Sequence, residues 1–248
     1  PQATLYGTGA LAGAVKLSSN DVGSDAPDYV EARIGNKESY RIEGATGDDI
    51  NTNWGYRVAL VHNRSDGFVE NTFLNRSDTA NIDETALRFA VEGSVDERTT
   101  LALTYRWYDI DNGYDAFSLD NDNKTLSDEP GFDEHQTHAV SARSTTNTAA
   151  GDFILIATHA SHNIAYGYDE DWTFTGFHPW GYTSFDAYYR DVETQTGEMR
   201  FVSSDSAALF DGMTDWTIGV FYKSTEEKLL RQYTYLDSDF ASEYTPTT

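Results

Sequence analysis

The stretch "TTLALTYRWYD", residues 99–109, alternates apolar and polar side chains with a period of two. In an extended chain one face of this segment carries four apolar or aromatic residues: Leu101, Leu103, Tyr105 and Trp107. Successive side chains of a strand point to opposite faces, so this pattern is typical of a β-strand with one apolar and one polar face. We therefore predict a strand here whose two faces meet different surroundings.

The same alternation recurs along most of the chain, and a helical period is almost absent. About nine candidate strands follow from it, at 28–35, 39–46, 53–62, 84–93, 99–109, 137–145, 152–162, 196–204 and 215–224. The fold class predicted from this pattern is all-β, as an antiparallel up-and-down sheet.

The connections between these strands alternate in length. Segments 65–82, 110–136 and 164–193 are long, while 94–98 and 146–151 are short and 205–214 is intermediate. An up-and-down transmembrane barrel has short turns at one end and long loops at the other. A soluble sandwich has no such order. The spacing therefore favours part of a transmembrane β-barrel.

Composition limits the partners. The 248 residues include 17 Lys and Arg against 41 Asp and Glu, a formal net charge of −24. This balance argues against nucleic acid and against attachment to anionic lipid by charge. Cysteine is absent, so disulfides and thiolate-bound metals are excluded. Many carboxylates fall in 110–136 and 164–193, where long loops would keep them hydrated.

The opening stretch "PQATLYGTGALAGAVKLSSN", residues 1–20, resembles the end of the plug domain of TonB-dependent outer-membrane receptors. The matching positions are Pro1, Leu5, Tyr6, Gly7, Gly9, Gly13, Val15 and Lys16. Ala12 departs from the pair of glycines that many members have at this turn. "YRIEGATGDDINTNWGYRVALVHNRSDGFVEN", residues 40–71, resembles the first barrel strands of the same family.

This resemblance implies an internal fragment, with residues 1–22 as the end of the plug and 23–248 as the N-terminal part of a larger barrel. It implies a receptor of the bacterial outer membrane that imports a scarce solute, most often a ferric siderophore, with energy coupled through TonB. TonB would act through an N-terminal region outside this chain, and lipid and lipopolysaccharide would surround the barrel. Two alternatives stay open: a secreted acidic β-sandwich that binds carbohydrate, and a simple outer-membrane pore.

No enzyme, cofactor or metal site is predicted. The carboxylates fall in polar loops rather than in an apolar pocket that would raise a pKa. His135 and His138 are three residues apart, as are His159 and His162, so on a strand each pair is split between opposite faces. The candidates for ligand contact are loop aromatics: Tyr114, Phe117, Trp172, Phe174, Trp180 and Tyr182. The open alternative is that these rings pack the loops onto one another.

Overall fold

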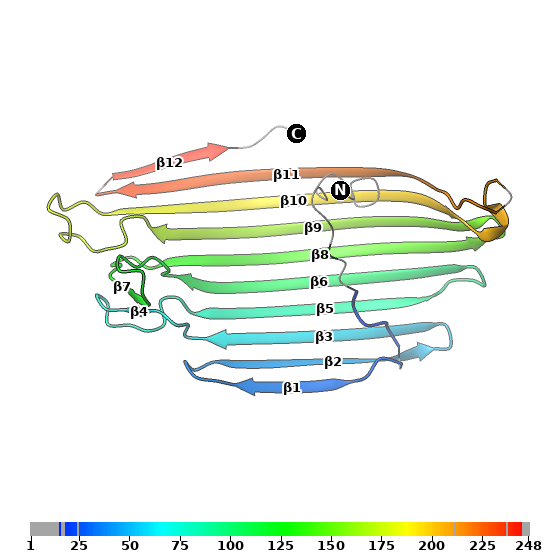
Figure 1. The fold of residues 1–248 in the computed structure, drawn as a ribbon, viewed down its shortest axis with the longest axis horizontal. Helices are drawn as coiled ribbons and strands as arrows, with labels where there is room; N and C mark the ends of the chain where they lie inside the picture. Colours follow the sequence, from blue (N-terminus) through cyan, green and yellow to red (C-terminus); the bar gives the residue numbers. More distant parts are fainter. Residues whose placement is uncertain (1–14, 16–17, 24, 211, 237, 245–248) are drawn as a thin grey trace.

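The computed structural model describes residues 15, 18–23, 25–210, 212–236 and 238–244. Ten strands form one antiparallel sheet in sequence order (Figure 1). They are β1 (Tyr29–Ile34), β2 (Tyr40–Asn51), β3 (Trp54–Ser65), β5 (Ile82–Ser94), β6 (Thr99–Tyr114), β8 (Gly131–Thr148), β9 (Gly151–Asp169), β10 (Ser184–Ser203), β11 (Thr217–Tyr235) and β12 (Ser238–Tyr244). A second, two-stranded sheet pairs β4 (Glu70–Asn71) with β7 (Lys124–Thr125). In the described part of the chain, no helix is long and apolar enough to cross a membrane.

The all-β, up-and-down prediction is confirmed, with ten strands in the main sheet where about nine were expected, but several boundaries were wrong. Only 170–183 of the segment 164–193 is a loop, because β9 continues to Asp169 and β10 begins at Ser184. The strand β12 was missed altogether. At the start of β10, aromatic side chains lie on both faces, Tyr188 on one and Phe185 and Tyr189 on the other, so polar and apolar residues do not alternate there. Several carboxylates assigned to loops, including Asp111, Glu134 and Asp191, therefore lie on strands.

The alternation of connections is confirmed. Segments 66–81, 115–130 and 170–183 lie at one end of the sheet, here called the loop end, and turns 52–53, 95–98 and 149–150 lie at the other, the turn end (Figure 1). Segment 204–216, at the turn end, is longer than its neighbours and contains the 3-10 turn Asp205–Ala207. The ten long strands form a single broad layer and not a sandwich of two sheets.

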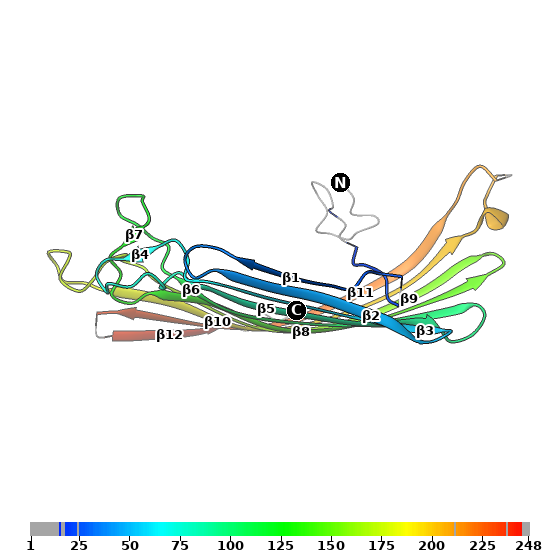
Figure 2. The ribbon, with the colours of Figure 1, turned by 90° about the horizontal axis from the view of Figure 1, so that it is seen from below.

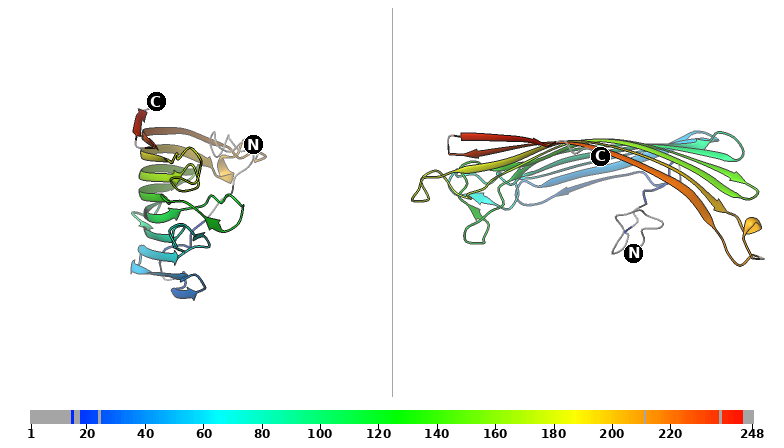
Figure 3. Two further views of the ribbon diagram at one scale, coloured as in Figure 1. Left: turned by 90° about the vertical axis from the view of Figure 1, so that its left-hand side faces the viewer. Right: turned by 90° about the horizontal axis from the view of Figure 1, so that it is seen from above.

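The sheet is bowed, and residues 18–23 approach it from its concave side (Figures 2 and 3). We call this the inner face; it carries Arg57, Arg88 and Arg106, which alternation places on the same side of β3, β5 and β6. Arg57 donates hydrogen bonds to the carbonyl oxygens of Ala26 and Pro27, at 3.3 and 2.9 Å. Residues 19–22 line a hollow together with Arg88 and Arg106. Residues 19–22, 26 and 27 therefore lie against the inner face of the sheet.

The opposite, outer face carries an apolar band near the turn end. Its exposed members come from seven neighbouring strands: Leu60, Phe89, Leu103, Val140, Leu155, Met199 and Val220, each 40 to 65% exposed. By contrast, the buried apolar side chains among the described residues are only Ala45, Ala90, Ile154 and Ala187. Contiguous exposed apolar surface of this kind marks a face that meets another apolar phase.

The proposed plug segment, residues 1–22, lies largely outside the described residues. Its assignment, and the boundary to a barrel at residue 23, stay predictions. The downstream "RSDG" motif at 64–67 is described. Gly67 has φ +83°, and a Cβ there would come within 2.2 Å of the Ala80 carbonyl oxygen. Glycine is thus required where loop 66–81 closes on itself.

Candidate ligand-binding site

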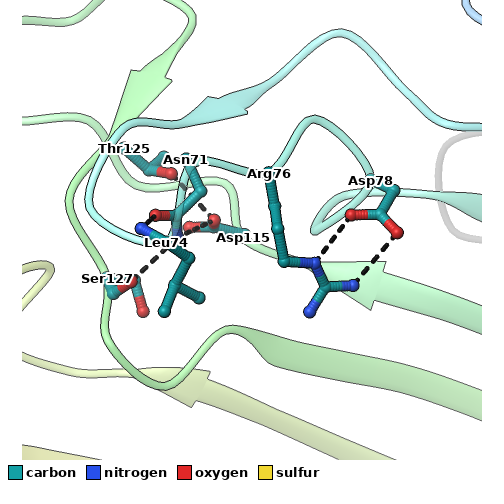
Figure 4. A network of polar contacts seen from close by, with 7 residues as sticks. All are labelled: Asn71, Leu74, Arg76, Asp78, Asp115, Thr125 and Ser127. Carbon is teal, nitrogen blue, oxygen red and sulfur yellow. Dashed lines mark hydrogen bonds and ion pairs between the residues drawn. The ribbon is translucent and has the colours of Figure 1, made fainter.

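Two loops at the loop end are joined through a buried polar network (Figure 4). Asn71 Nδ2 donates to Asp115 Oδ2 and to the Ser127 carbonyl oxygen, both at 2.8 Å. Thr125 Oγ1 donates to the same Asp115 oxygen at 2.8 Å. Asn71, Asp115 and Thr125 are 4% exposed or less. Loops 66–81 and 115–130 are therefore held together, and this fixes the segment that carries Phe117.

We expect Asn71→Ala to separate these loops. The change leaves the buried Asp115 carboxylate without one of its donors, which typically costs about 1–3 kcal/mol. Amide hydrogen exchange at Thr72, whose N–H donates to the Thr125 carbonyl oxygen at 3.0 Å, measures the opening. Arg76→Ala is the control, because the Arg76–Asp78 ion pair in the same loop is about half exposed and such pairs contribute little. Equal protection in both variants would contradict this role of the network.

Beside this network, six rings gather on the inner face at the loop end, here called the inner ring cluster. Its members are Tyr114, Phe117, Tyr166, Tyr168, Trp172 and Tyr188. Phe117 and Trp172 stack with centroids 5.0 Å apart and planes 5° from parallel. Tyr166 is 5.3 Å from Tyr114 and 5.8 Å from Tyr188. Two loops and strands β6, β9 and β10 thus build one aromatic surface.

Trp172 is positioned by a buried turn. It has a left-handed φ of 62°, and its N–H donates to Asp169 Oδ1 at 3.1 Å. The same oxygen accepts the Asp171 N–H at 3.1 Å. Burial, together with the negative charge of Asp171, raises the pKa of Asp169 to about 7. The hydrogen bonds to Asp169 offset the cost of the unfavourable backbone angle at Trp172. The indole consequently stacks on Phe117.

An ion pair closes the cluster on its β11 side. The Arg231 guanidinium contacts both oxygens of Asp186, at 2.8 and 2.7 Å, and Tyr188 Oη donates to Asp186 at 2.9 Å. The Asp186 side chain is 1% exposed. The guanidinium lies 5.4 Å from the Tyr188 ring centroid and 5.6 Å from that of Tyr233. Arg231 is thus both a counter-ion and a partner of two aromatic faces.

Asp186 and Arg231 lie well beyond the apolar band, and their contacts determine their charge states. Burial tends to raise the pKa of Asp186, but hydrogen bonds from Arg231 and Tyr188 outweigh it and hold the pKa below its usual value. The hydrogen bond with Asp186 raises the pKa of Arg231. Burial and the charge of Asp186 raise the pKa of Tyr168 to about 12. At neutral pH the site therefore offers neutral phenols and ring faces beside a balanced ion pair.

The predicted ligand residues divide into two groups. Tyr114, Phe117 and Trp172 join the inner ring cluster, whereas Phe174 and Tyr182 pack loops onto their neighbours. Phe174 stacks on Phe73 at 4.4 Å, and Tyr182 stacks on His178 at 5.1 Å and Tyr235 at 5.9 Å. Trp180 is 83% exposed and makes none of the ring contacts found among the described residues. Ligand contact by these six residues stays a prediction.

Sequence reasoning missed Tyr166 and Tyr168. Tyr166 and Tyr168 lie in β9, and Tyr188 lies in β10, within the segment expected to be a loop. The alternating run Ile164, Tyr166, Tyr168 was the available signal. No signal paired Asp186 with Arg231. Among the described residues, no group of three or more His, Asp or Glu side chains is arranged to hold a metal ion.

Comparisons with known proteins bear on the fold. No family model matches the sequence, and no curated protein matches it. Among solved structures, the ferric yersiniabactin uptake receptor FyuA from Yersinia pestis matches with a TM-score of 0.82 and 17% identity over 98% of this chain. The chain has the fold of part of a siderophore-receptor barrel.

Two other receptor structures match the same fold. The siderophore receptor PiuA from Acinetobacter baumannii matches with a TM-score of 0.62 and 14% identity over 86% of this chain. FpvAI, in its complex with pyocin S2, matches with a TM-score of 0.56 and 13% identity over 87%. This chain spans 38%, 32% and 29% of the three matched chains. The ten strands thus have the fold of a stretch of a receptor barrel.

Proposed function

We propose that this chain forms the first part of the barrel of a TonB-dependent receptor in the bacterial outer membrane, and that the receptor imports a ferric siderophore. The observation that carries the proposal is the match to FyuA over nearly the whole chain, at a TM-score of 0.82. The outer apolar band fits a lipid environment, since barrel strands present an apolar band of about 25 Å to lipid. The neighbours are transport receptors, which supports a receptor and not an enzyme.

The inner ring cluster supports a small, ring-bearing ligand. Its surface lies on the lumen side of the loop end, where a ligand arriving from outside first meets the barrel. Because the Arg231 charge is balanced by Asp186, recognition would come mainly from ring stacking and phenol hydroxyls. A plug ending near residue 22 would form the floor of this site, and TonB would act on the plug from the periplasm to open a passage.

Uptake of radioactive iron tests this function. The complete reading frame that contains these residues, expressed in an iron-starved host without its own receptors, is supplied with ferric catecholate, hydroxamate and phenolate siderophores. We expect uptake of at least one class, and loss of that uptake when TonB is deleted. Uptake that persists without TonB would support the simple pore instead.

We expect Trp172→Ala to weaken ligand binding more than Trp180→Ala does. A stacked aromatic contact is worth about 0.5–1.5 kcal/mol, so the dissociation constant should rise about 2- to 12-fold. Trp180→Ala serves as the matched control, because that indole lies outside the inner ring cluster. Ligand quenching of protein fluorescence measures both variants. A larger loss on replacing Trp180 would place the binding surface elsewhere in the loop.

A further inference from the structure

Two histidines from neighbouring strands meet on the inner face. His135 Nε2 and His162 Nδ1 lie 3.4 Å apart, and Thr137 Oγ1 lies 2.8 Å from the first and 2.9 Å from the second. Thr137 stands directly opposite His162 in the β8–β9 register. All three point toward the lumen, beyond the apolar band. Both rings are half-buried and Thr137 is 4% exposed.

The spacing of the two ring nitrogens fits a shared metal ion. Imidazole nitrogens bind zinc at about 2.0–2.1 Å, and two such ligands in tetrahedral geometry stand about 3.4 Å apart. The nitrogens already converge on one atom, the Thr137 hydroxyl, which has a single proton to donate. An ion in that place would be a common partner for both nitrogens. The strand pairing holds both rings close to this geometry, so little reorganisation is needed.

We propose that His135 and His162 bind a divalent transition-metal ion on the lumen side of the barrel wall. Imidazole suits copper and zinc, and the general affinity order places Cu²⁺ above Zn²⁺. The described residues supply two side-chain nitrogens, so water fills the remaining coordination positions. The site goes beyond iron uptake, because it takes a bare divalent ion and uses none of the residues of the inner ring cluster.

The chain contains a matched control. His138 and His159 lie on the same two strands with the same diagonal relation, since His138 faces Ser161 and Val140 faces His159. They point to the outer face and both are exposed. His138 Nδ1 instead contacts the hydroxyl of Tyr105 at 2.9 Å. On β8 and β9, histidine content and spacing are thus equal on the two faces, and of these two pairs the inner one meets.

Copper titration tests the proposal. Untagged protein from the complete reading frame, in detergent and stripped with a chelator, is titrated with Cu²⁺ alone and followed by electron paramagnetic resonance. We expect one ion bound with couplings from two imidazole nitrogens. His135→Ala and His162→Ala should each lose one coupling and weaken binding at least about tenfold, since even outer-shell partners of a metal contribute 10- to 100-fold.

Variants of the outer-face histidines are the control for copper binding at the inner pair. His138→Ala and His159→Ala should leave the spectrum and affinity unchanged. Should an alanine variant fail to fold, His135→Gln and His162→Gln keep a polar side chain on the strand and are read in the same way. An unchanged copper spectrum in the inner-face variants, or an equal loss in the outer-face variants, would overturn the proposal.

Discussion

Replacing Arg231 by leucine should open the loop end of β10 and β11. The change leaves the Asp186 carboxylate, 1% exposed, without its counter-ion. Removing one partner of a buried ion pair typically costs about 3–5 kcal/mol. Amide hydrogen exchange in this part of the sheet should therefore accelerate about 10²- to 10³-fold or more, measured on protein in detergent.

Asp186→Asn is the matched partner variant and should cost much less. It removes the buried charge, and the Arg231 side chain, 44% exposed, can be hydrated. Similar effects of the two variants would show that desolvation of Asp186 does not control the local stability.

The free energy of unfolding should depend on pH with opposite signs in the native protein and in Arg231→Leu. In the native pair the lowered pKa of Asp186 provides stability that is present at neutral pH and lost as the pH falls through the folded-state pKa. In Arg231→Leu only the hydrogen bonds from Tyr188 and Tyr168 still oppose burial, which is the largest influence on Asp186, and we expect the Asp186 pKa to rise. Lowering the pH through the carboxyl range should then stabilise the variant relative to its state at neutral pH.

Leu103→Arg should be the most damaging change on the outer face. Leu103 is 42% exposed and faces Val91 and Ala142 in the middle of the apolar band. An arginine facing lipid at the bilayer midplane of a barrel costs about 2–4 kcal/mol. Refolding into lipid vesicles, followed by heat-dependent gel migration and urea unfolding, should show this loss.

Gln136→Arg tests whether the loss of stability caused by an outer-face arginine depends on its position along the strand. Gln136 is exposed on the same face, but it lies beyond the band and opposite Asp109. An arginine there stays in water near a carboxylate and should change stability by less than about 1 kcal/mol. Equal effects of the two arginines would mean that the apolar band does not meet lipid, which would contradict the membrane placement.

The sequence by itself determined where most of the strands lie, their two faces and the order of long and short connections. The alternation in residues 99–109 suffices to place Leu103 and Arg106 on opposite faces, because side-chain direction in a strand depends only on local geometry. It failed at the start of β10, where aromatic residues such as Tyr188 and Tyr189 lie on both faces and the hydrophobic alternation is lost.

Only the tertiary structure decided which polar and aromatic groups meet. Asp186 and Arg231 are 45 residues apart, Asn71 and Asp115 are 44 apart, and His135 and His162 are 27 apart. Such partners depend on the register between strands and on how loops dock, and a shift of one residue would send every side chain to the other face. The histidines show this directly, since spacing within each strand separates neighbours and pairing between strands brings two of them together.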